Sequence, residues 1–343
     1  MEMLVADRDR RIEVLERAVA SAEAAAGVSS APAVFSSEAP GGGMPQLTIR
    51  GGNSEATVYL HGAHVTSWRV GGEEQLFVSK QAIFAPPKAI RGGIPVCWPQ
   101  FSDMGPLGQH GFARNTKWRV KASPAASAAA VDGSRCVLVL SRDDVKDAGA
   151  LAAWPWPFEV EMRLAVSDDA FTQELVVTNT GSEAFAFTAA LHTYFAVGSI
   201  AATSVEGLEG LTYLDNLDGR SPKVDGSSAV RFAEEVDRIY LAAPRAWAVV
   251  CEGGGGASER RVVGCATSEG LCDAVVWNPW AAKAKSLADF GDDEYERMVC
   301  VEAARCRPSE GTSLAPGDSW SGKQTLTAHT GPGKQRGAAA QQR

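Results

Sequence analysis

A nine-residue alternation constrains the fold of this chain more than any other feature. The segment FEVEMRLAV, residues 158–166, carries apolar side chains at every second position, with charged or small side chains between them. Successive side chains of a strand point to opposite faces, so the pattern predicts a strand with one buried and one solvated face. Such one-sided burial is typical of antiparallel sheets.

Further short runs rich in Val, Leu, Phe and Thr also predict strands. They are separated by turn-like sequences such as TNTGSEA and LDGRSP. The runs are TVYLHGAHVTSW (57–68), CVLVLS (136–141), FTQELVVTN (171–179) and RMVCVEAA (297–304). The sequence has no strand-helix-strand rhythm and no glycine-rich phosphate loop. We therefore expect an all-β chain built on a large antiparallel β-sandwich.

The two ends of the chain differ from this centre. Apolar residues recur at roughly helical spacing near the N-terminus and predict an accessory helix, which could serve in self-association or docking. A Ser/Pro/Gly-rich stretch follows it, and the C-terminal sequence GPGKQRGAAAQQR is typical of disorder. The predicted organisation is an accessory helix over 1–26, a flexible linker over 27–45, the β-sandwich over 46–328 and a disordered tail over 329–343.

Charge and cysteine content narrow the partners and the compartment. The 343 residues carry 33 basic and 41 acidic side chains, a net charge of -8, with no long basic block, so nucleic acid and anionic membranes are poor partners. The N-terminus has no apolar region of a secretory signal. Seven cysteines without a CxxC pair suit reduced, buried thiols, so we expect a cytoplasmic protein.

Only five histidines are available for chemistry, and His192 has the most informative surroundings. In EAFAFTAALHTYFAV, residues 183–197, strand alternation would place His192 and Tyr194 on a face otherwise lined by Ala and Thr. A face of small side chains leaves room for a ligand. A buried histidine satisfied by hydrogen bonds is an equally good interpretation from these residues.

Two further patterns leave alternatives open. Glu302 stands inside the apolar run RMVCVEAA, so its carboxylate lies either on a solvated face, which the run alone favours, or in a polar cleft where it is used. His61 and His64 resemble an HxxH metal pair, but a spacing of three on a strand sends the rings to opposite faces. Structural roles are the better prediction for that pair, and no metal is expected.

Seven motifs together resemble the glucose-6-phosphate 1-epimerase (hexose-6-phosphate mutarotase) branch of the aldose 1-epimerase superfamily. They are RGGIP (91–95), WPQF (98–101), QHGFARN (109–115), LHTYF (191–195), DRIY (237–240), VWNPW (276–280) and VCVEAA (299–304). The resemblance implies a galactose mutarotase-like β-supersandwich that interconverts the α and β anomers of a hexose 6-phosphate, glucose 6-phosphate first among them. It implies neither a metal nor an organic cofactor.

The resemblance also implies roles for particular residues. The family's catalytic histidine and carboxylate correspond to His192 and Glu302, and His110 corresponds to a histidine that assists near the ring oxygen. The implied substrate contacts are Arg91, Gln109, Arg114 and Asp237. Trp98, Phe112 and Trp277 are candidates for packing against the sugar, with core packing as the alternative for each.

The chemistry of anomer exchange agrees with these roles. Opening a cyclic hemiacetal requires removal of the C1 hydroxyl proton and protonation of the ring oxygen, which a carboxylate and an initially protonated histidine can supply. Arg91 and Arg114 suit a phosphate dianion. Two alternatives remain at this level: an aldose 1-epimerase acting on free sugars, and a carbohydrate-binding sandwich without catalysis.

Overall fold

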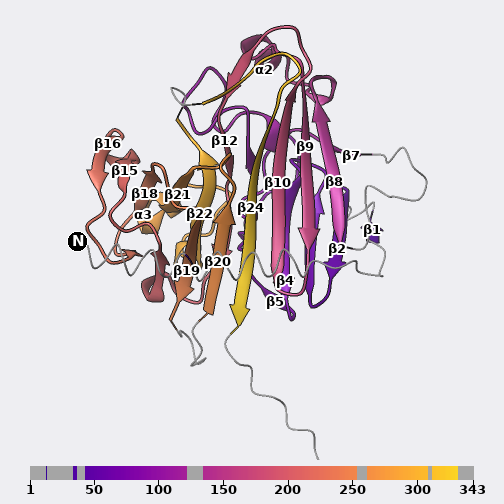
Figure 1. Ribbon diagram of the computed structural model, residues 1–343. Helices are drawn as coiled ribbons and strands as arrows, with labels where there is room; N and C mark the ends of the chain where they lie inside the picture. Colours follow the sequence, from indigo (N-terminus) through magenta and orange to yellow (C-terminus); the bar gives the residue numbers. More distant parts are fainter. Residues whose placement is uncertain are drawn as a thin grey trace, which may run out of the picture.

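The computed structural model describes residues 13, 34–36, 43–121, 134–252, 261–307 and 311–330, and element labels follow Figure 1. Within these residues the chain is mainly β-structure, arranged in antiparallel sheets of nine, eight, five and two strands. None of the helices in the described part is long and apolar enough to span a membrane.

The nine-stranded sheet runs in the order β17-β14-β19-β20-β24-β10-β9-β8-β7. Its strands are β7 (Arg119–Val120), β8 (Arg135–Ser141), β9 (Phe158–Val166), β10 (Ala170–Asn179), β14 (Thr203–Glu206), β17 (Val230–Arg231), β19 (Ala246–Cys251), β20 (Arg261–Thr267) and β24 (Ser319–Thr330).

The eight-stranded sheet runs in the order β16-β15-β18-β21-β22-β12-β6, and β13 also pairs with β22. Its strands are β6 (Val96–Cys97), β12 (Ala189–Leu191), β13 (Tyr194–Ala196), β15 (Thr212–Asp215), β16 (Ser221–Val224), β18 (Val236–Tyr240), β21 (Asp273–Asn278) and β22 (Met298–Arg305).

The smaller sheets and the helices complete the described chain. The five-stranded sheet contains β1 (Val34–Ser36), β2 (Gln46–Gly51), β3 (Ser54–Tyr59), β4 (His64–Val70) and β5 (Glu73–Glu74), and β11 (Phe185–Phe187) pairs with β23 (Thr312–Leu314). The α-helices are α2 (Ala148–Ala153) and α3 (Trp280–Lys285), and the 3-10 helices are η1 (Ala113–Asn115), η2 (Arg142–Asp144), η3 (Ile200–Ala202), η4 (Asn216–Asp218) and η5 (Glu294–Arg297).

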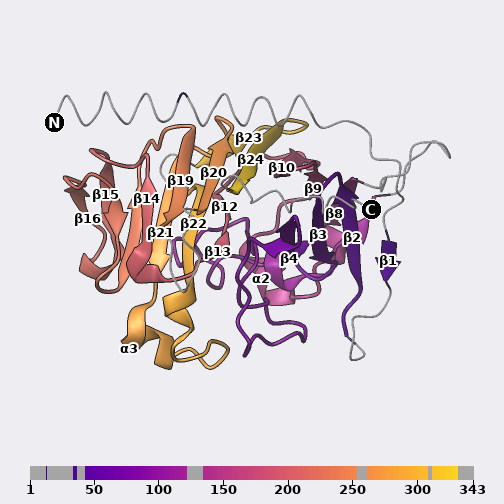
Figure 2. The same cartoon turned by 90° about the horizontal axis from the view of Figure 1, so that it is seen from below.

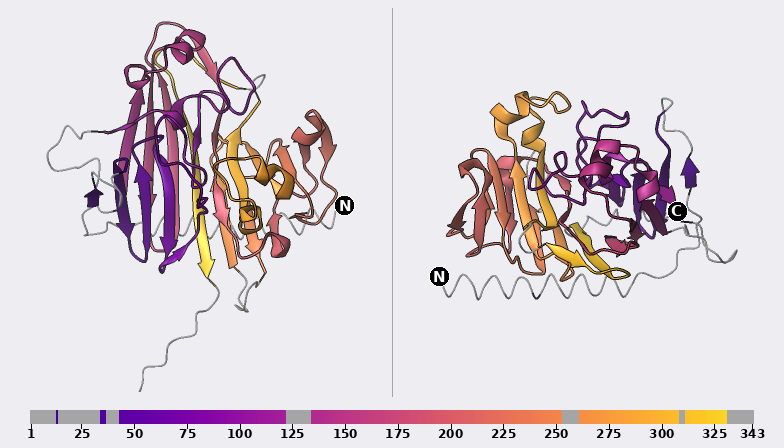
Figure 3. Two further views of the ribbon diagram at one scale, coloured as in Figure 1. Left: turned by 180° about the vertical axis from the view of Figure 1, so that it is seen from behind. Right: turned by 90° about the horizontal axis from the view of Figure 1, so that it is seen from above.

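The sheets form two layers, which confirms the predicted all-β sandwich. The nine-stranded sheet is one layer, and the five- and eight-stranded sheets lie side by side as the other (Figures 1 and 2). Trp68 of β4 packs on Phe171 of β10 across the layers, with ring centroids 6.0 Å apart. Helix α3 and the loops of residues 80–115 lie on the side of the second layer that faces away from the nine-stranded sheet (Figure 3).

The strongest sequence pattern folds as predicted. In β9, alternate residues from Phe158 to Val166 are buried, and the residues between them are partly or fully exposed. The 57–68 run instead spans the end of β3, a turn and most of β4, because Gly62 and Ala63 adopt positive φ angles and reverse the chain. The run around His192 is divided into β11, β12 and β13.

The predicted ends of the chain fall partly outside the described residues. The accessory helix (1–26), apart from Glu13, and residues 331–343 of the predicted tail are not described, so both remain predictions. Within the predicted linker, β1 pairs with residues Gln46 to Thr48 of β2, so that segment is not irregular throughout. Residues 329 and 330 of the predicted tail belong to the end of β24.

Candidate active site

His192 lies directly opposite Glu302 across two antiparallel segments. Leu191 pairs with Ala303 and Tyr194 with Cys300, so the same register places residue 192 against residue 302. Residues directly opposite in such a pair share one face of the sheet. The Nδ1 atom of His192 is 3.2 Å from Oε1 of Glu302, at ion-pair distance but without the alignment of a hydrogen bond.

The pair is on the outer face of the eight-stranded sheet. Thr193, between His192 and Tyr194, points to the opposite layer, where its hydroxyl accepts a hydrogen bond from Nε2 of Gln324 at 3.1 Å. Neighbouring side chains alternate, so His192 and Tyr194 face away from the core between the layers. Their rings stack with centroids 4.8 Å apart, which agrees with the shared face predicted from the sequence.

Burial shifts the pKa values of the pair toward their neutral forms. His192 is 8% exposed and Glu302 only 2% exposed. Burial raises the pKa of Glu302 well above its usual value, and the carboxyl group of Asp237 raises it further. Burial and the positive charges of Arg114 and Arg91 hold the pKa of His192 well below its usual value. Burial and the neighbouring charges therefore favour a protonated Glu302 beside a neutral His192, the reverse of the starting state expected from the sequence.

His110 lies beside this pair, and its backbone has a positive φ of 66°. The ring centroids of His110 and His192 are 5.4 Å apart in an edge-to-face arrangement. Nδ1 of His110 accepts a hydrogen bond from the backbone N–H of Ser102 at 3.2 Å, so a neutral ring carries its proton on Nε2. Burial holds the pKa of His110 well below its usual value, which favours that neutral donor.

Arg91 and Arg114 line the same cavity, of about 400 Å³, together with Tyr194 and Asp289. Nε and Nη2 of Arg91 lie 3.1 and 3.0 Å from Oδ1 of Asp289, and Nη1 donates to the hydroxyl of Tyr194 at 3.3 Å. Nη2 of Arg114 donates to the backbone carbonyl of Gln109 at 2.9 Å. Of the two arginines, Arg91 is thus already paired with a carboxylate.

Gln109 and Asp237 line a second cavity of about 540 Å³, together with Asn216. Nδ2 of Asn216 donates to Oδ1 of Asp237 at 2.6 Å. Burial raises the pKa of Asp237 to about 6, although the Asn216 hydrogen bond acts in the opposite direction. Asp237 also pairs with Trp277 in the sheet, and the ring centroid of Trp277 is 6.2 Å from that of His192.

His61 and His64 hold the backbone around Arg91. Nε2 of His61 is 2.8 Å from the carbonyl oxygen of Lys88, and Nε2 of His64 is 2.7 Å from that of Gly92. A carbonyl only accepts, so each ring nitrogen must donate. No cluster of three or more potential metal-ligating side chains occurs among the described residues. The two hydrogen bonds agree with the structural role that the sequence favoured for these histidines.

The aromatic candidates divide between core and site. Trp98 is fully buried, and its ring contacts those of Phe112, Trp154, Phe158 and Phe187. Phe112 is 4% exposed and belongs to the same core cluster. Core packing, the alternative given for each aromatic, therefore describes Trp98 and Phe112 better than packing against a sugar, although Phe112 also lines the cavity that contains Arg114. Partly exposed Trp277, beside His192, remains a candidate.

Two polar residues of the site were not foreseen from the sequence. Asn216 is the first residue of η4, and its side chain donates a hydrogen bond to the carboxyl group of Asp237. Asp289 lies in the loop after α3, and its carboxylate forms an ion pair with Arg91. Both occur in polar segments where an isolated Asn or Asp has no distinguishing spacing. Only the pairing of distant segments reveals them, since Asp289 is 198 positions from its partner.

The fold and this site identify a sugar-epimerising class of protein. Residues 45–327 match the aldose 1-epimerase family, and the chain belongs to that family of isomerases. A protein of Cenchrus ciliaris provisionally named glucose-6-phosphate 1-epimerase is 43% identical over 297 residues, which cover 83% of this chain and 85% of that protein. A protein of the same provisional name from Escherichia coli K12 is 34% identical over 256 residues, covering 73% of this chain and 79% of the other.

Solved structures show the same fold. A provisional mutarotase from Salmonella typhimurium superposes with a TM-score of 0.72 at 26% identity, covering 89% of this chain and 96% of the other. A galactose mutarotase related enzyme from Lactobacillus acidophilus superposes with a TM-score of 0.64 at 14% identity, covering 83% and 97%. The second likeness bears on the fold alone.

Proposed function

We propose that this protein is a glucose-6-phosphate 1-epimerase, which interconverts the α and β anomers of hexose 6-phosphates. The observation that carries the proposal is the 3.2 Å approach of His192 to Glu302. This acid-base pair adjoins, through Tyr194, a cavity lined by Arg91 and Arg114. The provisional names of the relatives in Cenchrus ciliaris and Escherichia coli support the phosphorylated substrate.

The proposed reaction needs two proton transfers in each direction. The Glu302 carboxylate takes the C1 hydroxyl proton while the His192 imidazolium protonates the ring oxygen, and the C1–O5 bond breaks to leave an open-chain aldehyde. The chain rotates about the C1–C2 bond. Protonated Glu302 then returns a proton to the aldehyde oxygen while neutral His192 takes the proton of the C5 hydroxyl, and the ring closes on the other face.

The protonation state that burial favours fits the second half of this cycle. Protonated Glu302 beside neutral His192 is the state that closes the open-chain sugar. For the cyclic sugar, one proton must first pass from Glu302 to His192. Glu302 and His192 together carry one proton at every stage of the cycle. The two groups therefore titrate as a coupled pair. The positive charges of Arg91 and Arg114 lower the pKa of His192. A phosphate dianion bound beside them offsets these charges, raises the pKa of His192 and so favours proton transfer from Glu302 to His192.

The remaining polar residues have roles around the ring. A neutral His110 would donate from Nε2 near the ring oxygen, and Asp237 and Gln109 would accept or donate hydrogen bonds at the sugar hydroxyls. Trp277 would pack against the apolar face of the ring. The ring distances of His110 and Trp277 from His192 support the roles of these two residues. The cavity that Gln109 and Asp237 both line supports theirs.

Anomer exchange tests the proposal directly. Saturation-transfer NMR is recorded on glucose 6-phosphate and on free glucose at equal concentrations, with and without the protein. Acceleration confined to the phosphorylated sugar supports the proposal. Equal acceleration of both sugars would instead define a general aldose 1-epimerase, and no acceleration of either would leave a carbohydrate-binding sandwich.

We also propose a reducing compartment such as the cytosol. All seven cysteines are free thiols, and six of them are buried. This state is the one expected from the cysteine pattern and is typical of intracellular proteins.

A further inference from the structure

The cavity of about 400 Å³ beside the catalytic pair carries an excess of positive charge. Its charged lining residues are Lys88, Arg91, Arg114 and Asp289. Asp289 is bound to Arg91 at 3.0 Å, so this carboxylate largely neutralises one of the three cations. Two positive charges remain without a carboxylate partner within ion-pair distance in the described part of the chain, and two is the charge needed to match a phosphate dianion.

Arg114 supplies one of these charges. Its hydrogen-bond partner is the neutral carbonyl of Gln109, and its buried Nε has none among the described residues. Burying a guanidinium without an anion is costly, so the cavity gains stability when an anion enters it.

Lys88 supplies the other charge. Its ammonium group has no hydrogen-bond or ion-pair partner among the described residues. Its backbone carbonyl and backbone N–H, in contrast, both form hydrogen bonds. The Lys88 carbonyl accepts from His61 at 2.8 Å, and its N–H donates to the Ala85 carbonyl at 3.2 Å. These two backbone hydrogen bonds fix the position from which the Lys88 side chain reaches into the cavity.

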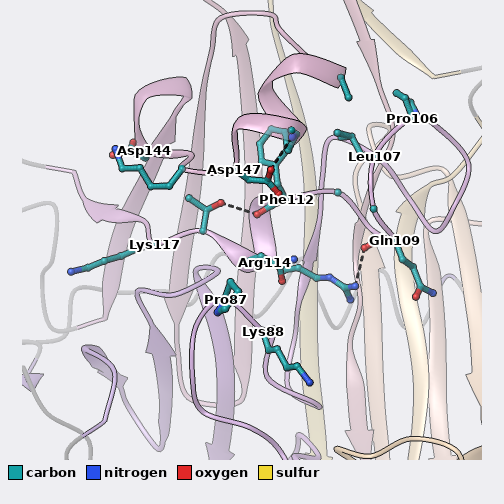
Figure 4. A pocket seen from close by; sticks show the side chains of 18 residues that line it. Pro87, Lys88, Pro106, Leu107, Gln109, Phe112, Arg114, Lys117, Asp144 and Asp147 are labelled. Atoms are coloured by element: carbon teal, nitrogen blue, oxygen red, sulfur yellow. Dashed lines mark hydrogen bonds between the residues drawn. The ribbon is translucent and has the colours of Figure 1, made fainter.

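A larger cavity, of about 1,090 Å³, adjoins the 400 Å³ cavity and shares Lys88 and Arg114 with it. Its lining does not include His192 or Glu302. Figure 4 shows Lys88 and Arg114 extending toward the same side, whereas Lys117 points away from both. Lys88 thus stands at the boundary of the two cavities, close to the side that leads to Tyr194 and His192.

We propose that Lys88 and Arg114 together bind the phosphate dianion of the substrate in the 400 Å³ cavity, and that Lys88 sets the preference for phosphorylated over free hexoses. Asp289 holds Arg91 beside this site and prevents Arg91 from carrying the dianion alone. The inference rests on the proposed function and adds to it the residue that distinguishes the two substrate classes.

The test compares Lys88→Met with Lys88→Arg and with Lys117→Met, the control. Lys117 lines the larger cavity without lining the smaller one. We measure kcat and KM for glucose 6-phosphate and for free glucose, and the inhibition constant of inorganic phosphate. Melting temperatures show that each variant is folded.

For Lys88→Met we expect KM for glucose 6-phosphate and the inhibition constant of phosphate to rise together by about tenfold or more, the effect of losing one charged hydrogen bond. The kcat value and the kinetics on free glucose should stay at wild-type levels. Lys88→Arg should retain most of the affinity, and Lys117→Met should resemble wild type.

Two results would overturn the inference, and they are distinguishable. If Lys88→Met matched Lys117→Met in both constants while the wild-type enzyme preferred glucose 6-phosphate, Lys88 would not bind the phosphate and the proposed function would stand. If the wild-type enzyme accelerated both sugars equally, the proposed function itself would fail, and the inference with it.

Discussion

Nδ1 of His192 and Oε1 of Glu302 are 3.2 Å apart because the register of β12, β13 and β22 places the two residues directly opposite each other. Each group alone is a buried polar side chain that burial drives toward its neutral form. In the proposed reaction they act as an acid and a base that share one proton. The register brings together two residues that the sequence shows only as isolated features.

Removing either member of this pair should abolish most of the activity. We expect His192→Ala and Glu302→Gln each to lower kcat for glucose 6-phosphate by about 10²- to 10⁴-fold, the usual contribution of one positioned acid or base. NMR exchange measures the rate, and circular dichroism checks the fold.

Asp273→Asn is the control for these two variants. Asp273 is a buried carboxylate of β21 that accepts hydrogen bonds from the backbone N–H groups of Ala242 and Cys306. It should lose stability and keep its turnover. Wild-type turnover in a folded Glu302→Gln variant would refute the assignment.

The arginines should affect the phosphorylated substrate selectively. We expect Arg91→Ala and Arg114→Ala to raise KM for glucose 6-phosphate by about 10- to 100-fold, because each removes a charged donor. Arg91→Ala also leaves Asp289 unpaired, which repels the dianion. Arg245→Ala serves as the control, since Arg245 forms an exposed ion pair with Glu269. Unchanged KM values in both site variants would remove the phosphate assignment.

Gly93 should be essential to the segment that carries Arg91. Its φ is +61°, and an added Cβ would lie 2.1 Å from the carbonyl oxygen of Val65. Gly72 also has a positive φ, +84°, but an added Cβ would meet no atom within 4 Å. We expect Gly72→Ala to cost about 1 kcal/mol of unfolding free energy and Gly93→Ala about 3 kcal/mol or more. Urea unfolding measures both. Equal losses would show that the clash with Val65 is relieved without cost.

Acid should destabilise the fold through buried His64. Burial lowers the pKa of His64 from 6.5 to about 4, so the unfolded chain takes up this proton first as the pH falls. The stabilisation is full above about pH 6.5 and is lost progressively toward pH 4, with a total of about 3 kcal/mol. Urea unfolding between about pH 7 and pH 4.5 measures the slope. His64→Gln retains a donor for the Gly92 carbonyl and should have a smaller slope. An unchanged slope in that variant would assign the acid sensitivity to other groups.

The sequence alone determined the class of fold, the family and the most regular strand, β9, although two other apolar runs are divided by turns in the structure. Alternation in β9 depends only on the period of two in a strand, and burial follows it residue by residue. The motifs likewise made His192, Glu302 and Arg91 candidate site residues without any coordinates, because a motif is local.

Only the tertiary structure decided how these residues work together. The sequence pattern of RMVCVEAA favoured a solvated Glu302, yet the carboxylate is 2% exposed because β22 lies inside the eight-stranded sheet. Trp98 looked suited to a sugar and is instead a core residue. Asp289 neutralises Arg91 from 198 positions away, which leaves Lys88 and Arg114 as the uncompensated cations of the cavity. The physical reason is common to all three: register, burial and long-range ion pairs depend on which distant segments meet, and no local spacing records that.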